Sequence, residues 1–330
     1  MRLDELKQRY EARGLPTSEY DLAAATITAL DTMLRKEGKG EDADHLSTAS
    51  LDRFIRSLRE TGAISYEAFV GMLRYYYVIG STEIYIRLTK YTGGIGVIEN
   101  ILDRLESTVS KEVRDRVMAG ISIPPLGTSP DELPLFIEEF MRRLRRELSG
   151  SRLERVLSGN NHGVPDQAFA EEKIAYEMAP TFEQYLKEYH ERQIAVLQQH
   201  ADSGKPWFEQ KITQEVVDFV KANPEIQGAV LKDGILYETK IPYDIENWLH
   251  AKTPEDKRYY ACHCPFARES IRAGKTVIDP LWCHCSGGFV KRMYEVIFGR
   301  SLRAKCLMNA LQGDEVCRFA IDMRAVDYKR

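Results

Sequence analysis

Hydrophobic positions in the first 200 residues recur with the spacing of a helix. Leu51, Phe54, Ile55 and Leu58 stand at i, i+3, i+4 and i+7, which places them on one helix face. The same spacing returns in segments 98–105 and 137–148. Segment 73–88 is apolar nearly all round, which predicts one central buried helix. Residues 1–200 are therefore predicted to form an all-helical domain.

The pattern changes after a turn-rich stretch at 201–206. Segment 210–223 fits one more amphipathic helix. Two short apolar runs then flank Lys232-Asp233-Gly234, and Asp-Gly is the signature of a tight hairpin turn. A second hairpin is predicted from 302–311 and 316–323, with its turn at 312–315. The predicted fold class is α+β: a helical N-terminal domain (1–200) followed by a smaller α+β domain with an antiparallel sheet (205–330).

Composition narrows the class of protein. The chain of 330 residues is 43% hydrophobic and 29% charged, with a formal net charge of −4, as in ordinary soluble globular proteins. The acidic balance argues against wholesale nucleic-acid binding. The charged start does not fit a signal peptide, and no apolar run reaches the roughly 18 residues of a membrane span. We expect a cytoplasmic protein that does not associate with membranes, in which thiols stay reduced.

All six cysteines fall in the last 69 residues. Four of them form two identical triplets, Cys262-His263-Cys264 and Cys283-His284-Cys285, and Cys306 and Cys317 follow. In an extended stretch, residues i and i+2 share one face, so both cysteines of a triplet can reach one site while the histidine points away. We predict a metal site with these six cysteines as candidate ligands. Zinc is the leading metal, and an iron–sulfur cluster ranks lower because no C-x-x-C spacing occurs.

Each triplet is also predicted to abut a helix N-terminus. Pro265 favours a helix start that makes Cys264 the N-cap, with Gly274 as the C-terminal cap. Ser286 is the expected N-cap of a helix over 287–298 that ends at Gly299. Free amide donors and the helix dipole stabilise thiolates there, so lowered thiol pKa values are predicted. Reversible dithiol chemistry and ordinary buried cysteines stay open as alternatives.

The surroundings of the triplets are basic. Eleven Lys or Arg residues and five acids lie between 252 and 305, a local charge of +6. This excess can steer a small anionic ligand toward the thiols, although a solvated helix face gives the same pattern. Candidate ligand-binding residues in and near this region are Lys240, Tyr243, Arg258, Tyr260 and Arg268.

The C-terminal segments carry a resemblance to known families. Gly288-Phe289 after the second triplet, Gly313-Asp314, and Cys317-Arg318-Phe319 on the last strand resemble the vinyl-4-reductase-type ligand-binding domain. The same ending is similar to that of the L-2-amino-thiazoline-4-carboxylate hydrolase group. The whole chain also resembles a bacterial protein family without an assigned activity, through segments such as Pro124-Pro125-Leu126-Gly127.

The first resemblance implies zinc beside a small-molecule pocket over roughly residues 205–330. By position, it places metal ligands at Cys283, with Cys285 as a neighbour, at Cys317, and at Cys306, where the family has an acidic residue. Asn309 stands where the family has a further cysteine, and a cysteine of the first triplet could fill that gap.

Three functions follow as alternatives. The first is a small-molecule-binding protein with a cysteine-ligated zinc site. The second is a hydrolase of a small carbon–nitrogen ring or amide, in which Cys264 or metal-bound water attacks and His263 or His284 serves as base. The third is a thiol redox sensor that uses paired cysteines. Whether the protein is an enzyme at all stays open, as do its ligand and its oligomeric state.

Overall fold

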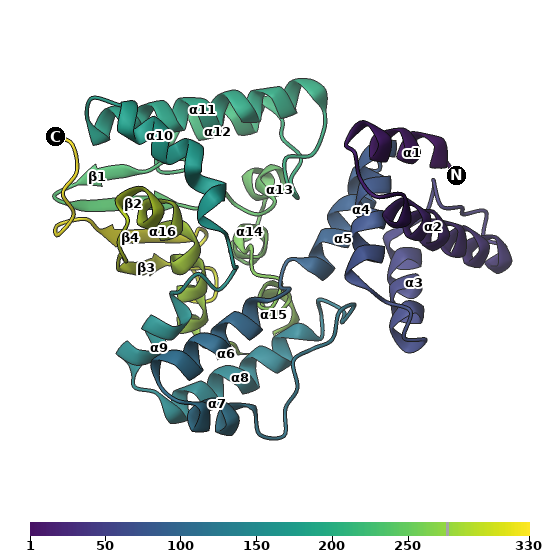
Figure 1. The fold of residues 1–330 in the computed structure, drawn as a ribbon, viewed down its shortest axis with the longest axis horizontal. Coiled ribbons are helices and arrows are strands. Elements are labelled where there is room, and N and C mark those ends of the chain that lie inside the picture. Colours follow the sequence, from purple (N-terminus) through teal and green to yellow (C-terminus); the bar gives the residue numbers. More distant parts are fainter. Residues whose placement is uncertain (275–276) are drawn as a thin grey trace. The chain divides into compact units, whose positions relative to one another are not determined.

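The computed structural model describes residues 1–274 and 277–330, and the chain divides into two compact units (Figure 1). Unit 1 comprises Met1–Ile95 and Pro124–Leu133, and unit 2 comprises Gly96–Ile123 and Pro134–Arg330. The α+β class is confirmed, with a helical N-terminal region followed by a part that holds a small antiparallel sheet. The expected boundary near residue 205 lies inside unit 2. An apolar helix stripe predicts burial but not which partner buries it, so the helices after residue 96 could not be assigned to the sheet in advance.

Unit 1 is entirely helical. Its elements are α1 Leu3–Ala12, α2 Thr17–Glu37, α3 Thr48–Glu60, α4 Tyr66–Ile79 and α5 Thr82–Thr92. The predicted stripe on α3 is buried, with Leu51 and Ile55 at the core. The single helix expected over 73–88 is wrong: Gly80 adopts φ 76° and ends α4, and α5 begins two residues later. Gly permits this left-handed C-cap at no steric cost, so an apolar segment can turn without leaving the core.

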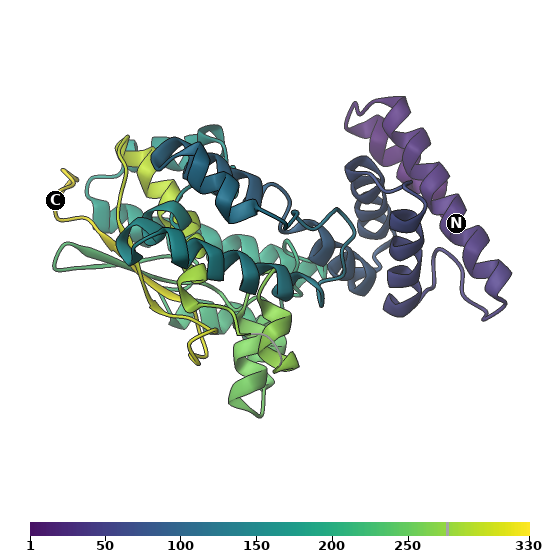
Figure 2. The ribbon, with the colours of Figure 1, turned by 90° about the horizontal axis from the view of Figure 1, so that it is seen from below.

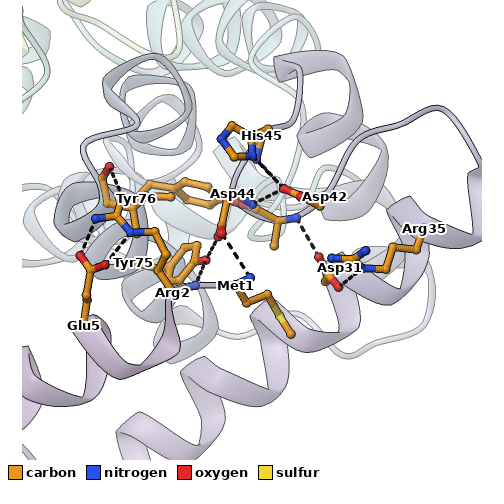
Figure 3. A network of polar contacts seen from close by, with 12 residues as sticks. Met1, Arg2, Glu5, Asp31, Arg35, Asp42, Asp44, His45, Tyr75 and Tyr76 are labelled. Carbon is orange, nitrogen blue, oxygen red and sulfur yellow. Dashed lines mark hydrogen bonds and ion pairs between the residues drawn. The ribbon is translucent and has the colours of Figure 1, made fainter.

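Figure 3 shows a polar network that joins α1, α2, α4 and the loop after α2. Asp31 of α2 accepts a hydrogen bond from the Ala43 backbone N–H at 3.0 Å and pairs with Arg35 at 2.6 Å. The Tyr76 hydroxyl donates to the Ala43 carbonyl at 3.0 Å. Asp44 accepts from Tyr75. Loop backbone groups that would be unsatisfied inside the unit are thus paired by side chains from two helices.

Unit 2 contains most of the helices. They are α6 Val97–Thr108, α7 Lys111–Met118, α8 Leu133–Glu147, α9 Gly150–Leu157, α10 Ala170–Met178, α11 Phe182–Ser203, α12 Gln214–Ala222, α13 Ile245–His250, α14 Pro254–Ala261, α15 Arg268–Ala273 and α16 His284–Phe298, with short 3-10 turns η1 Asp166–Phe169 and η2 Pro280–Cys283. The apolar stripes predicted over 98–105 and 137–148 are buried on α6 and α8. Among residues 1–274 and 277–330, no helix is long and apolar enough to cross a membrane.

The sheet of unit 2 has four antiparallel strands in the order β1-β2-β4-β3. They are β1 Val230–Lys232, β2 Ile235–Thr239, β3 Ala304–Met308 and β4 Arg318–Asp322. Both predicted hairpins are confirmed. In the first, Asp233 and Gly234 adopt φ of 52° and 73°, the paired positive values of the tight hairpin turn expected from Asp-Gly. The sheet therefore brings two segments about 80 residues apart in sequence next to each other through the β2–β4 pairing.

Helices cover one face of this sheet. Leu236 of β2 and Ile321 of β4 are fully buried in one cluster with Tyr185 of α11 and Tyr294 of α16. Figures 1 and 2 both show α16 running along the sheet, and α11 packs with α12 beside it. Phe319 of β4 is buried on the same face as Ile321. It belongs to a second buried cluster, which also contains Cys262 and Cys317. The candidate site therefore lies at one end of the helix-covered face.

Candidate thiol–lysine site

Five of the six cysteines come from four separate segments to one place. Cys262 follows α14, Cys264 lies in the next turn, Cys283 ends η2, Cys306 is on β3 and Cys317 precedes β4. We call these five residues the thiol cluster. All six cysteines of the chain are free thiols.

Both the packing and the electrostatics of the five cysteines show that they lie close together. Cys262 and Cys317 are buried in one apolar cluster with Phe319, and Cys264 and Cys306 pack against that cluster. The pKa of Cys283 is raised well above its usual value, first by burial and then by the negative charge that the other four thiols of the cluster would carry. Each of these five sulfur atoms is thus close enough to others to be affected by their ionisation.

The predicted lowering of thiol pKa values is wrong. Burial raises the pKa of all six cysteines, to about 12 for Cys285 and Cys306. For Cys264, the Trp282 indole and the backbone amides of Phe266 and Ala267 act in the expected direction, but desolvation outweighs them. Isolated thiols in this setting stay protonated at neutral pH, and only a bound cation or a proton acceptor would change that.

The predicted helix caps are half right. Gly274 and Gly299 end their helices in the left-handed conformation, as expected. Cys264 is not an N-cap, because α15 begins only at Arg268 and Ala267 stands at the N-cap position. Ser286 is not an N-cap either, since α16 already begins at His284. There Asp279 caps the preceding η2 turn with a bond to Leu281 N–H at 2.9 Å.

The two triplets use their cysteines differently. Cys262 and Cys264 both belong to the thiol cluster, as the extended-chain argument predicted. The second triplet is helical, and there residues i and i+2 lie about 200° apart. Cys283 therefore faces the cluster, whereas Cys285 points to another side, and of the cluster thiols only Cys264 raises its pKa. Cys285 instead lies 3.8 Å from the side-chain nitrogen of Asn161 and 3.6 Å from Nε2 of His162.

Among the described residues, no hydrogen bond joins the ring of His263 or His284 to the Cys264 sulfur. Nε2 of His263 donates to the Ile241 carbonyl at 2.5 Å, and its ring packs edge-on against Tyr243. Burial lowers the pKa of His263 well below its usual value and lowers that of His284 as well. Both histidines are therefore neutral at physiological pH, and His263 has its Nε2 proton committed to a backbone oxygen.

Lys240, which follows β2, is one of two cations at the site. Its backbone N–H donates to the Cys317 carbonyl at 2.9 Å, and its ammonium lies 5.3 Å from the ring centre of Phe289. Its positive charge lowers the pKa of Cys264 and Cys317, although less than burial raises them. Among the residues that the structure describes, no carboxylate forms an ion pair with this ammonium and no acceptor hydrogen-bonds to it.

The other predicted ligand-binding residues divide into two groups. Arg268 is 2% exposed, stacks 4.0 Å over the Tyr243 ring and lowers the pKa of Cys262, so these two line the site. Arg258 is committed to the Ala310 carbonyl at 2.9 Å, and Tyr260 lies under the guanidinium of Arg272. Lys275, one of the eleven basic residues counted above, falls outside the described residues.

Several neighbours of the thiols were not predicted. Trp282 donates its indole N–H to the Cys264 sulfur at 3.1 Å, and the side-chain amide of Asn309 lies 3.5 Å from the Cys306 sulfur. Asn161 and His162 reach Cys285 from a loop that the sequence marks only as turn-rich. Asn309 stands where the resembling family carries a cysteine, and this is the one signal in the sequence for these neighbours.

The sulfur atoms of the thiol cluster are suitable ligands for a thiophilic metal ion, but their present arrangement is not that of a metal site. The cluster offers more sulfur atoms than the four positions of a tetrahedral zinc site. Yet within the described part of the chain, no three His, Cys, Asp or Glu side chains are already grouped to hold an ion. The sulfur atoms are neighbours, and side-chain rotation would have to bring them to a common centre.

No protein-family model, curated protein or solved structure matches the chain. The proposals below therefore rest on the site itself.

Proposed function

We propose that unit 2 is a small-molecule-binding module in which the thiol cluster binds a thiophilic metal ion, zinc in the first place, beside the Lys240 ammonium. The observation that carries the proposal is the meeting of five thiols from four segments in one place, two of them buried and three partly buried. Buried cysteines that serve packing alone need no partners of their own kind, whereas soft sulfur ligands gathered together are what zinc requires.

Bound zinc would supply positive charge that keeps the coordinating sulfurs as thiolates. The chain's own contribution is to present the sulfurs from short, well-anchored segments. Trp282 holds Cys264 through its indole N–H, and Asn309 holds Cys306 through its amide. Such supporting contacts orient ligands and favour the charged sulfur.

Cobalt titration tests the metal proposal. Protein purified without an affinity tag should contain stoichiometric zinc, and its cobalt form should show the thiolate-to-cobalt absorption of tetrahedral sulfur coordination. Cys283→Ser and Cys317→Ser should each weaken cobalt binding by more than about tenfold, since even supporting contacts around a metal contribute that much. Cys285→Ser is the matched control, because Cys285 faces Asn161 and His162. An absence of metal and of the absorption band, or an equal loss in the control, would contradict the proposal.

The ligand end of the site is assigned to Lys240. An ammonium without an acidic partner, beside the 43% exposed ring of Phe289, suits the carboxylate of a small aromatic acid. Benzoate serves as a probe: it should raise the thermal midpoint of the wild-type protein, and Lys240→Met should remove that shift. Lys305→Met, which removes an exposed ammonium from β3, should leave it unchanged. If benzoate raises the thermal midpoint of Lys240→Met as much as that of the wild type, Lys240 does not bind the ligand. The metal proposal would not be affected by that result.

Hydrolysis through Cys264 is a second candidate, supported by the hydrogen bond from Trp282, which stabilises a negative sulfur. A raised thiol pKa and the absence of a histidine hydrogen bond to Cys264 within the described residues weigh against it. If Cys264 is the nucleophile, Cys264→Ser should abolish turnover of an amide or thiazoline substrate while leaving the fold intact. Redox sensing is less favoured on the same grounds, and thiol counts that fall in pairs under peroxide would revive it.

A further inference from the structure

Unit 2 has a concave region whose lining includes no residue of the thiol cluster. It is a cleft of about 650 Å³, within the size range of small-molecule sites. Side chains from α6, η1, α10 and α16, and from the turn after α16, line it. Four of the lining residues are cations, namely Arg104, Lys173, Arg292 and Arg300, and two are acids, namely Asp166 and Glu295.

The two acids already have partners. Asp166 forms an ion pair with Arg292, and Glu295 pairs at 2.6 Å with Lys291, which reaches it from the buried side of α16. In the described residues, no acid pairs with Arg104, Lys173 or Arg300. The cleft therefore presents an uncompensated positive charge, in contrast to the slightly acidic chain as a whole.

Two close backbone approaches hold one of these cations in place. A Cβ atom at Gly159 would lie 1.9 Å from Nε of Arg104, so the guanidinium packs directly on this glycine. A Cβ at Gly288 of α16 would in turn lie 2.1 Å from the Gly159 carbonyl oxygen. Gly288 thus lets the loop at 158–159 pack directly on α16, and Gly159 of this loop in turn contacts the Arg104 guanidinium.

A further group in the cleft lacks a partner. Nε of Arg292 is buried and makes no hydrogen bond within the described residues, although the same guanidinium reaches Asp166. Nine of the twelve lining residues are polar or charged, so the cleft suits a polar ligand and offers little to an apolar one. Guanidinium groups match the oxygen atoms of phosphate through paired, charge-assisted hydrogen bonds.

We propose that this cleft binds a small phosphorylated molecule through Arg104 and Lys173. Arg300 adds positive charge beside them, although its guanidinium also donates to the Ala325 carbonyl. The site is separate from the thiol cluster and does not depend on the function proposed for it. The prepositioned Arg104 and the flexible, exposed Lys173 would hold the phosphate oxygens from two sides.

Calorimetric titration of the full chain with pyrophosphate tests the proposal. Wild-type protein should bind it saturably, and the affinity should fall as salt is raised. Arg104→Gln and Lys173→Gln should each weaken binding about tenfold, the scale of one lost charge-assisted contact. Arg152→Gln is the control, because Arg152 is an exposed arginine of α9 outside the cleft. No saturable binding at millimolar pyrophosphate, or equal losses in control and test variants, would overturn the proposal.

Two further measurements keep the test decisive. Citrate, which carries carboxylates in place of phosphates, should bind more weakly than pyrophosphate, and tighter citrate binding would overturn the assignment to phosphate. Lys173→Gln changes an exposed side chain and should leave the circular dichroism spectrum and the thermal midpoint unaltered. Its loss of affinity can therefore be read even if Arg104→Gln, next to Gly159, disturbs the fold.

Discussion

At the scale of single residues, Glu238 on β2 shows how burial alone can set the charge of a side chain. Burial raises the pKa of its carboxyl to about 8, and the nearby Lys240 ammonium offsets only part of this effect. In the part of the chain described by the structure, no side chain or backbone group hydrogen-bonds to this carboxyl. Glu238 is therefore largely protonated at neutral pH in the folded protein, whereas in the unfolded chain it ionises near pH 4.3.

This difference predicts the sign of a pH effect. The folded state binds the proton more tightly, so the contribution of Glu238 to stability is present in full below about pH 4.3 and is lost as the pH rises through about 8. Glu238→Gln cannot ionise, so its free energy of unfolding should rise relative to wild type as the pH increases from 5 to 8. Urea unfolding at three pH values measures this gap. Glu183→Gln, on the exposed first turn of α11, should give a constant gap, and a constant gap for Glu238→Gln would contradict the prediction.

The arrangement of a site residue could be predicted where it depends only on the neighbouring sequence. The two cysteines of the first triplet share one face because the chain there is not helical, as the spacing argument assumed. The second triplet breaks the rule because Asp279 and Pro280 start the helical turn before Cys283, a signal that stands just ahead of the motif. Desolvation of the thiols could not be read from the sequence, because it depends on Val290 and Phe319 arriving from distant elements.

At the scale of elements, the Gly287-Gly288 pair on α16 gives a matched comparison. A Cβ at Gly288 would collide with backbone atoms, 2.1 Å from the Gly159 oxygen and 2.8 Å from the Ser158 carbon. A Cβ at Gly287 would meet the Phe319 ring at 3.5 Å and the Ala304 Cβ at 3.7 Å, and both are ordinary contacts. Both glycines are buried within the same helix.

Gly288→Ala should therefore lower the free energy of unfolding of unit 2 by about 1–3 kcal/mol, the usual cost of overpacking. Gly287→Ala should be neutral or stabilising by up to about 1 kcal/mol, because Ala favours helix over Gly. Urea denaturation followed by circular dichroism compares the two directly. Equal effects at both positions would show that the close approach to residues 158–159 does not limit packing.

Elements with strong local signals were predicted well. The β1–β2 hairpin follows from Asp-Gly turn chemistry, and the stripes of α3, α6 and α8 follow from their helical periodicity. The break between α4 and α5 was missed because Gly80 sits in an otherwise continuous apolar run, where periodicity alone does not reveal a left-handed cap. The pairing of β2 with β4 needed contacts across about 80 residues, which turn signals do not supply.

At the scale of the whole molecule, each unit can be tested by itself, and a buried carboxylate offers the test for unit 1. In unit 1, Asp31 is 5% exposed, and Arg35 together with the Ala43 N–H lowers its pKa. A carboxylate with a lowered folded pKa adds stability above its unfolded pKa, near 3.9, and this stability is lost as the pH falls through the folded value.

Asp31→Ala should destabilise unit 1 by about 1–3 kcal/mol at neutral pH, because it leaves the buried Ala43 N–H without an acceptor. Hydrogen exchange followed by mass spectrometry should show faster exchange in peptides of α2, α4 and the loop at 41–46. Peptides of unit 2 should exchange as in wild type. Asp21→Ala, which removes an exposed carboxylate from the same helix, should change neither, and equal acceleration throughout the chain would contradict the assignment to unit 1.

The placement of every cysteine in unit 2 has a practical consequence. Cys262, Cys285 and Cys317 are each less than 10% exposed, so an alkylating reagent reaches them only when that half of the molecule opens. Pulsed labelling with iodoacetamide, read at these three cysteines, would then time the opening of unit 2 with no engineered probe, whereas Cys264, Cys283 and Cys306 are partly exposed. Unit 1, which contains no sulfhydryl, would stay silent in the same experiment.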